Sequence, residues 1–192
     1  MIRIISGSLR GRRLITPAGF DVRPTSDRVR TALFNILGRW IEGRRVLDLF
    51  AGAGGVGFEC LSRGAAHVTF VESNREARAC LSHNAELLNL RQQILIIPAD
   101  AARAIPSLRG QRFDFIFADP PYRGADPLAL LAALHGAQLA GPDSVCVIEH
   151  ALPRLFMPET AYEQWRCYRS SRYGKTCLSF FDLAAPPPVS ST

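Results

Sequence analysis

A glycine-rich loop between a predicted strand and a predicted helix constrains the fold of this chain more than any other feature. Residues 45–50 form an apolar run that predicts a buried strand, and a helix is predicted over 58–63. The loop between them carries Gly52, Gly54 and Gly57. Glycine lets the backbone approach a ligand closely, and a helix N-terminus offers free N–H donors. The segment therefore predicts a ligand site at the carboxyl end of a parallel strand.

The alternation of strands and helices continues along the chain. Further strands are predicted over 67–71, 94–97, 113–118 and 144–149. A capping box at Ser73-Asn74-Arg75-Glu76 opens a helix that reaches about Leu90, and Asp126-Pro127 opens another over 128–135. Runs at 165–172 and 176–183 flank Tyr173-Gly174-Lys175 and predict a hairpin. This order indicates an α/β fold with a parallel sheet and an antiparallel edge.

The N-terminal quarter of the chain is strongly basic. Through Arg45 it holds ten arginines against three acids, an excess of seven, whereas the remainder has 13 basic and 14 acidic residues. Residues 2–16 predict two short strands around a Gly/Ser turn, with Arg10, Arg12 and Arg13 exposed. A helix capped by Thr25 or Ser26 follows, and Arg23, Arg28 and Arg30 cluster at its start. Arginines in this arrangement favour docking to nucleic-acid phosphates, and a solvated, charge-protected edge is the alternative.

Three segments follow from these patterns. Residues 1–42 form the basic hairpin and helix, residues 43–183 form the main domain, and the Pro/Ser-rich residues 184–192 are expected to be disordered. The chain has no apolar run long enough for a membrane span, and its five scattered cysteines form no CxxC pair. We therefore expect a cytoplasmic, monomeric protein without a structural metal.

The tetrapeptide Asp119-Pro120-Pro121-Tyr122 ends the predicted strand 113–118. Prolines cannot continue the strand's hydrogen bonds, so the acid and the aromatic are held in a stiff turn at a carboxyl end. Asp119 and the Pro120 carbonyl accept hydrogen bonds, and Tyr122 offers a flat face. These groups suit a planar base with an exocyclic amine. An ordinary Pro-Pro turn is the alternative.

The glycine spacing leaves more than one activity open. Gly52-x-Gly54-x-x-Gly57 matches the dinucleotide fingerprint, and Glu72 lies at a suitable distance to bind a ribose, so an NAD-dependent oxidoreductase is one hypothesis. Asp48 inside the first strand and the lack of room for a substrate domain argue against it. A non-catalytic RNA-binding factor is a second alternative, which the intact Asp119–Tyr122 box disfavours.

The pattern Asp48-x-Phe50-x-Gly52-x-Gly54, then Glu72, Asp100 and Asp119–Tyr122, resembles S-adenosylmethionine-dependent methyltransferases. Arg23-Pro24-Thr25-x-Asp27-Arg28-Val29-Arg30 and the N-terminal Arg/Gly segment narrow the match. They resemble the bacterial 16S rRNA guanine-N2 methyltransferase family, small-subunit rRNA methyltransferase D. The resemblance runs from the N-terminus to the Tyr173-Gly174 hairpin. Because the Asp-Pro-Pro-Tyr box also serves adenine-N6 methyltransferases, adenine-N6 methylation is the alternative activity.

The resemblance implies a Rossmann-like class I fold with a mostly parallel seven-stranded sheet, an antiparallel C-terminal hairpin and a small N-terminal hairpin and helix. It also implies S-adenosylmethionine as cofactor and 16S rRNA, within an assembling 30S subunit, as partner. The implied cofactor residues are Asp48, Phe50, Ala51, Gly52, Gly54, Glu72, Asp100 and Ala101. Glu72 would bind the ribose hydroxyls, and Asp100 the adenine amine. Asp119, Pro120 and Tyr122 would hold the target base. For Asp100, a helix N-cap is the alternative role.

Overall fold

An eight-stranded sheet runs through the computed structural model of the protein, which describes residues 2–17, 27–121, 126–152 and 156–184. The strand order is β5-β4-β3-β6-β7-β10-β9-β8. β5, β4, β3, β6 and β7 are parallel, and β10, β9 and β8 add antiparallel pairs. The strands are β3 (Arg45–Leu49), β4 (His67–Val71), β5 (Ile94–Ile97), β6 (Phe113–Ala118), β7 (Ala140–Ala151), β8 (Thr160–Tyr162), β9 (Trp165–Tyr173) and β10 (Thr176–Leu183). The predicted α/β class and the C-terminal hairpin are confirmed.

The prediction of seven strands is wrong by one. β8 has three residues and pairs with the first residues of β9, where Tyr162 lies opposite Trp165. It shows no alternating apolar pattern, because two of its three residues are exposed. β8 therefore adds a short outer edge that neither the sequence pattern nor the family resemblance indicated.

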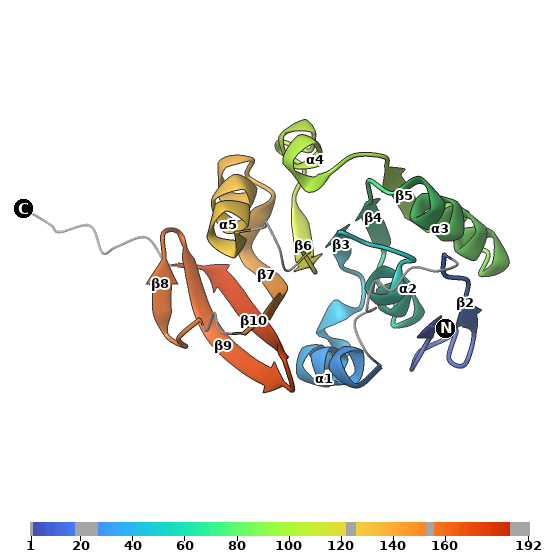
Figure 1. Cartoon of the computed structure of the whole chain (residues 1–192), viewed down its shortest axis with the longest axis horizontal. Helices are drawn as coiled ribbons and strands as arrows, with labels where there is room; N and C mark the ends of the chain where they lie inside the picture. The colour runs from blue at the N-terminus through green and yellow to red at the C-terminus, as the bar shows by residue number, and fades with distance from the viewer. Residues whose placement is uncertain (1, 18–26, 122–125, 153–155, 185–192) are drawn as a thin grey trace, which may run out of the picture.

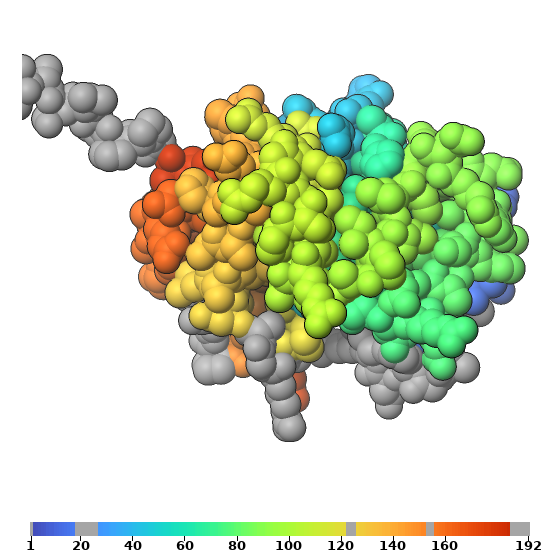
Figure 2. Space-filling view, turned by 90° about the horizontal axis from the view of Figure 1, so that it is seen from above, coloured from blue at the N-terminus to red at the C-terminus, as the bar shows by residue number. Residues whose placement is uncertain are grey.

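Helices cover both faces of the sheet (Figure 1). One core cluster joins α1, α2 and α3 to one face, and a second joins α4 and α5 to the other. Figure 2 looks onto the face where α4 and α5 lie side by side. The helices are α1 (Asp27–Leu37), α2 (Gly55–Ser62), α3 (Arg75–Leu87), α4 (Ala101–Ser107) and α5 (Pro127–Gly136), with short 3-10 turns η1 (Gly38–Ile41) and η2 (Arg91–Gln93).

Polar side chains cap α3, α4 and α5. Asn74 caps α3 by accepting from the Ala77 N–H at 2.9 Å, so the cap lies one residue after the predicted Ser73. Asp126 caps α5, with Pro127 at its first position as predicted. The predicted caps of α1, Thr25 and Ser26, lie outside the described residues. Each cap satisfies an N–H that the helix itself leaves without a partner.

The predicted N-terminal hairpin is present as β1 (Ile2–Arg3) and β2 (Arg13–Leu14). Ile2, Ile4 and Leu14 are buried in the same cluster as α1, α2 and α3. Apolar burial therefore fixes the hairpin against the main sheet domain, and its arginines lie on the outer side of a packed element. The predicted tail, 184–192, lies outside the described residues beyond Ala184.

Candidate functional site

The carboxyl ends of four parallel strands lie in one row. Leu49 of β3 pairs with Val71 of β4 and with Ala118 of β6, and Val71 pairs with Ile97 of β5. Phe50, Glu72 and Asp119 are each the next residue of their strand. Neighbouring strands are about 4.8 Å apart, so these three positions stand side by side at one edge of the sheet. The sequence predicted all three as site residues.

The loop after β3 has an unusual backbone. Phe50, Gly52 and Gly54 have φ values of 59°, 55° and 85°. A non-glycine residue in this left-handed region is uncommon and is held there only by its surroundings. Ala51 is buried and donates its N–H to the Val71 carbonyl at 3.1 Å. A Cβ built on Gly52 meets no atom within 4 Å, so the loop leaves open space at that point.

Glu72 fixes the loop at the end of β4. Its carboxylate accepts from the Gly52 N–H at 2.8 Å and from the Asn74 N–H at 2.7 Å. A carboxylate has about four acceptor sites, so two N–H bonds leave capacity for a ligand's hydroxyls. Binding of ribose by Glu72 stays a prediction, and the structure adds that the same group positions the loop.

Asp48 is buried beneath this loop, and its Oδ2 accepts from the Gly57 N–H at 2.9 Å. Burial raises the pKa of Asp48 from 3.8 to about 8, the Gly57 bond opposes this rise, and the charge of Glu72 adds to it. Loss of water around a carboxyl disfavours its charged form. Near neutral pH, Asp48 is therefore mostly protonated.

Asp48→Asn should flatten the dependence of stability on pH. The folded-state pKa lies above the unfolded value of 3.8, so the native protein keeps a proton that the unfolded chain releases. Asp48 therefore lowers the free energy of unfolding as pH rises from about 4 to about 8, by up to ~1.4 kcal/mol per pH unit. Asparagine cannot ionise but can still accept from Gly57. Urea unfolding at pH 5 and pH 8 measures the difference, and an identical pH profile in both proteins would refute a raised pKa.

Asp100 is the N-cap of α4. Its Oδ1 accepts from the Arg103 N–H at 2.9 Å, and the carboxylate is 53% exposed. The alternative role considered for this residue is therefore present. Ala101 is buried at the first position of α4. Because a capping carboxylate keeps unused lone pairs, binding of an adenine amine by Asp100 stays a prediction.

Asp119 and Pro120 follow β6 directly. Asp119 is half-buried, Pro120 is buried, and Pro121 is exposed. Tyr122 lies outside the described residues, so its predicted stacking stays a prediction. β6 stands next to β3, which places Asp119 one strand away from the start of the loop after β3.

The basic residues divide into two groups. Arg10, Arg12, Arg13 and Arg28 are exposed, and Arg23 lies outside the described residues. The prediction that Arg30 contacts RNA is wrong, because the Arg30 side chain is only 1% exposed. Its guanidinium donates to Gly55 and Arg3 carbonyls and to Asp27. α1 turns Arg30 inward, together with Val29 and Leu33, so it is a structural residue.

Comparison with known proteins gives a consistent family. The family model described as "Conserved hypothetical protein 95" matches residues 2–182. The "Putative rRNA methyltransferase YlbH" of Bacillus subtilis is 37% identical over 182 residues, which cover 94% of this chain and 98% of that protein. "Ribosomal RNA small subunit methyltransferase D" of Escherichia coli is 40% identical over 122 residues, covering 64% of this chain and 61% of that protein. The chain belongs to the small-subunit rRNA methyltransferase D family.

A solved structure supports the family. "Putative methyltransferase yhhF from Escherichia coli" superposes with a TM-score of 0.84 at 30% identity, covering 96% of this chain and 99% of that chain. The resemblance drawn from the sequence is therefore confirmed. The protein is a methyltransferase with S-adenosylmethionine as its cofactor.

The site of this family member fits that cofactor. The loop leaves open space at Gly52, and Glu72 offers carboxylate oxygens at the end of β4. The residues that would hold the cofactor are those of the loop 51–57, with Glu72, Asp100 and Ala101. Among the described residues no group of three or more His, Cys, Asp or Glu side chains is arranged to hold a metal ion. The described helices include none that is long and apolar enough to cross a membrane.

Two buried polar residues in this methyltransferase escaped the sequence analysis. Glu59 on α2 and Asn84 on α3 are both 0% exposed. Glu59 accepts from the Ile5 and Ser6 N–H groups, and Asn84 bonds to Ile15 and to the Ala53 carbonyl. Glu59 stands between Phe58 and Cys60, and Asn84 lies one helical turn after Cys80 and Leu81. That position was the available signal, since a polar side chain on a buried face needs partners.

Proposed function

We propose that the protein transfers a methyl group to the exocyclic N2 amine of a guanine in 16S rRNA of the small ribosomal subunit. The observation that carries the proposal is the position of Asp119-Pro120, one strand away from the cofactor loop in the row of strand ends. The names of both relatives support rRNA as substrate, and the name of the Escherichia coli relative supports the small subunit. The guanine is supported by the family resemblance of the N-terminal and Arg-Pro-Thr segments. Such a substrate would place the reaction in the cytoplasm, on a subunit under assembly.

Asp119 and Pro120 would activate the amine by accepting its hydrogens. The amine lone pair is delocalised into the base, so the nitrogen is a poor nucleophile. Accepting one N–H at the Asp119 carboxylate and the other at the Pro120 carbonyl favours a tetrahedral nitrogen with a localised lone pair. This assistance consists of positioning and of stabilising positive charge on nitrogen. Asp119 or water then takes the proton that the amine loses.

Bound S-adenosylmethionine supplies the electrophilic methyl group. The role of the chain is to hold the cofactor and the target base at a fixed distance and orientation. The rigid backbone at the row of strand ends would provide this. The target base must leave its stack to reach Asp119. His150, near the end of β7, takes no part, because its ring bonds the buried Ser179 hydroxyl at 2.8 Å.

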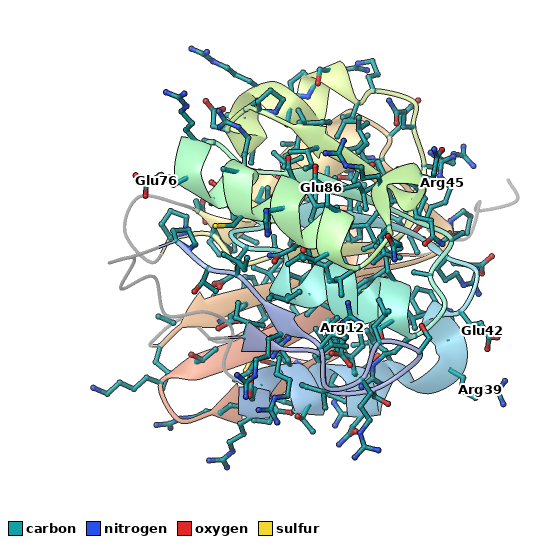
Figure 3. The ribbon with its side chains drawn as sticks, turned by 90° about the vertical axis from the view of Figure 1, so that its right-hand side faces the viewer. Arg12, Arg39, Glu42, Arg45, Glu76 and Glu86 are labelled. Carbon is teal, nitrogen blue, oxygen red and sulfur yellow. The ribbon has the colours of Figure 1, made fainter. Side chains whose placement is uncertain are left out.

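The outer face of the N-terminal hairpin would dock the RNA backbone. Arg3 and Arg13 are directly paired across β1 and β2, and both are exposed. Like charges at such a position are destabilising unless an anion lies between them. Arg12 reaches α3, where it donates to the Leu87 carbonyl at 2.9 Å and remains exposed (Figure 3). The hairpin thus presents a row of arginines without a matching row of acids.

Replacing Arg10, Arg12 and Arg13 with alanine should weaken RNA binding and reduce its salt dependence. Each lost phosphate contact flattens the slope of log affinity against log salt by roughly 0.7–0.9. In the triple variant the slope of log RNA affinity against log salt should therefore become flatter by about 2. The affinity for the cofactor should stay unchanged. Filter binding to small ribosomal subunits over a range of salt measures the RNA affinity and its slope, and calorimetry with S-adenosylmethionine measures the cofactor affinity.

A matched control replaces the exposed Arg39, Arg109 and Arg112, which lie near the amino ends of β3 and β6, away from the site. This variant has the same change in net charge and should keep the wild-type slope. Equal slopes in the two triple variants would show that the hairpin makes no phosphate contacts. The RNA surface would then lie elsewhere, with Arg28 at the start of α1 as the next residue to replace.

The test of the proposed function is transfer of labelled methyl groups in vitro. Small subunits from a strain without the enzyme, naked 16S rRNA and duplex DNA would be offered separately, and the products digested to nucleosides for mass spectrometry. We expect label in N2-methylguanosine of 16S rRNA. Label in N6-methyladenine would instead support the alternative, since Asp119 and Pro120 can hold that amine equally well.

A further inference from the structure

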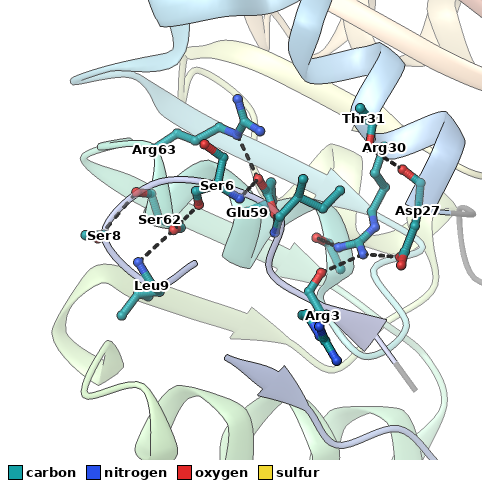
Figure 4. A network of polar contacts seen from close by, with 12 residues as sticks. Arg3, Ser6, Ser8, Leu9, Asp27, Arg30, Thr31, Glu59, Ser62 and Arg63 are labelled. Carbon is teal, nitrogen blue, oxygen red and sulfur yellow. Dashed lines mark hydrogen bonds and ion pairs between the residues drawn. The ribbon is translucent and has the colours of Figure 1, made fainter. Parts of the chain in front are cut away.

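Arg30 joins the N-terminal hairpin to the cofactor loop. Its Nη1 donates at 3.0 Å to the carbonyl of Gly55, the first residue of α2. Its Nη2 donates at 2.8 Å to the Arg3 carbonyl in β1 and at 2.6 Å to Asp27 (Figure 4). A guanidinium is planar and always charged, so it holds its acceptors in a fixed geometry. A displacement of β1 therefore also displaces the Gly55 carbonyl, because Arg30 bonds to both.

Asn84 makes a second, independent connection from α3. Its Oδ1 accepts from the Ile15 N–H at 2.8 Å, and its Nδ2 donates to the Ile15 carbonyl at 2.9 Å. The same Nδ2 donates at 3.2 Å to the carbonyl of Ala53 in the cofactor loop. Ile15 directly follows β2. The second strand of the hairpin is thus connected to the loop as the first one is.

The two connections meet on three consecutive residues. Asn84 bonds to Ala53, Arg30 bonds to Gly55, and Gly54 with its φ of 85° lies between them. Both bonds are made to backbone carbonyls, so they restrain the loop itself. Arg30 and Asn84 are 1% and 0% exposed, which keeps water from replacing either contact.

The hairpin's turn is fastened to the far end of α2. Glu59 accepts from the Ile5 and Ser6 N–H groups at 2.7 and 3.0 Å, and Ser62 bonds to Ser6 and Leu9 (Figure 4). A Cβ on Gly7 would lie 1.8 Å from the Ser62 carbonyl oxygen, so only glycine allows this approach. The hairpin therefore lies against the whole of α2, whose first residues belong to the cofactor loop.

From these contacts we propose that Arg30 and Asn84 are positioning residues that couple the RNA-docking hairpin to the cofactor loop. Cofactor binding restricts the motion of residues 53–55. The hydrogen bonds of Arg30 and Asn84 extend this restriction to β1 and to Ile15. RNA docking on the hairpin in turn favours the cofactor-bound form of the loop, because coupling between two sites is reciprocal. The effect of RNA docking on the loop is the RNA half of this inference, and it rests on the proposed function. The effect of cofactor binding on the hairpin is the cofactor half, and it concerns only this chain.

Hydrogen exchange tests the cofactor half without RNA. The full-length protein would be measured by mass spectrometry with and without saturating S-adenosylhomocysteine, the product form of the cofactor. In the wild type, exchange in peptides covering residues 2–15 should slow at least about fivefold, the lower end of typical site-to-site coupling. Unchanged hairpin exchange in a wild-type protein whose loop becomes protected would overturn the proposal.

Two variants separate coupling from general stability. Arg30→Lys keeps the charge but loses the planar fork. Asn84→Asp keeps the acceptor for the Ile15 N–H but loses the Nδ2 donor to the Ile15 and Ala53 carbonyls. In both variants S-adenosylhomocysteine should still slow hydrogen exchange in the loop. It should no longer slow most of the exchange in the hairpin. Ser144→Ala is the control, since this buried hydroxyl bonds Phe113 and Gly141, on the opposite face of the sheet. If the ligand slows hairpin exchange in Arg30→Lys and Asn84→Asp as much as in Ser144→Ala, these two residues do not couple the hairpin to the loop.

A binding measurement then tests the RNA half. The affinity for S-adenosylhomocysteine would be measured alone and with unmodified small ribosomal subunits. In the wild type the subunits should tighten it at least about fivefold, and in either variant the ratio should approach one. If subunits do not bind at all, the proposed substrate is wrong while the exchange result stands. If they bind without changing the cofactor affinity of the wild type, the coupling to RNA is wrong.

Discussion

Asp119→Ala is expected to abolish methyl transfer while the affinity for S-adenosylmethionine stays within a few-fold. The carboxylate stands at the end of β6, where it would accept an N–H of the target amine, whereas Glu72 and the loop after β3 would hold the cofactor. Removal of one well-placed electrostatic partner of a transition state reduces rates by about 10²–10³. In the proposed mechanism Asp119 would also position the nucleophile, so the loss of rate should be at least that large. Single-turnover transfer to small ribosomal subunits measures it.

The control for this variant lies on the same strand. Asp114→Ala removes an equal charge at the other end of β6, where the carboxylate accepts from the Arg45 N–H. Its transfer rate should remain near the wild-type value. Near wild-type transfer by Asp119→Ala would mean that the amine is held by other groups, and the mechanism would be wrong.

Glu72→Ala should weaken binding of S-adenosylmethionine by roughly 10- to 150-fold, which corresponds to about 1.5–3 kcal/mol. Ribose hydroxyls would lose a charged acceptor. The structure adds a second cause, because the carboxylate also accepts from the Gly52 and Asn74 N–H groups. Without it, the loop loses the bond from Gly52 to the end of β4, although the Ala51 N–H still donates to the Val71 carbonyl. Isothermal titration calorimetry gives the affinity directly.

Glu76→Ala is the matched control for the Glu72 variant. Glu76 lies four residues later, in the first turn of α3, where it is exposed to solvent (Figure 3). The control has the same change in charge without touching the loop, and it should bind the cofactor as the wild type does. If the two variants bind equally well, Glu72 does not hold the cofactor.

The residues at the strand ends could be predicted because local patterns define them. Short apolar runs mark β3, β4 and β6, and the acid or glycine after each run marks the place where the strand stops. Parallel pairing then brings Phe50, Glu72 and Asp119 together without any detail of packing. Glycine and proline near these ends gave the turns, since both restrict the backbone strongly.

The direction of Arg30 could not be predicted, because it depends on contacts distant in sequence. Besides the nearby Asp27, its acceptors are the carbonyls of Arg3, 27 residues before it, and Gly55, 25 residues after it. Charge clustering suggested an exposed arginine, whereas the fold needed a buried donor between two carbonyls. The same limit applies to Glu59 and Asn84, whose partners lie 53–54 and 31–69 residues away. β8 was missed for another reason, since three mostly exposed residues have no periodic pattern.

Methylation of a guanine N2 amine in small-subunit rRNA is tested most directly by nucleoside analysis of cells. Mass spectrometry would compare 16S rRNA from the parent strain, a deletion strain, and the deletion strain complemented with the wild-type or the Asp119→Ala gene. We predict that one N2-methylguanosine per 16S rRNA disappears on deletion, returns with the wild-type gene and stays absent with Asp119→Ala. An unchanged N2-methylguanosine content in the deletion strain would contradict the account.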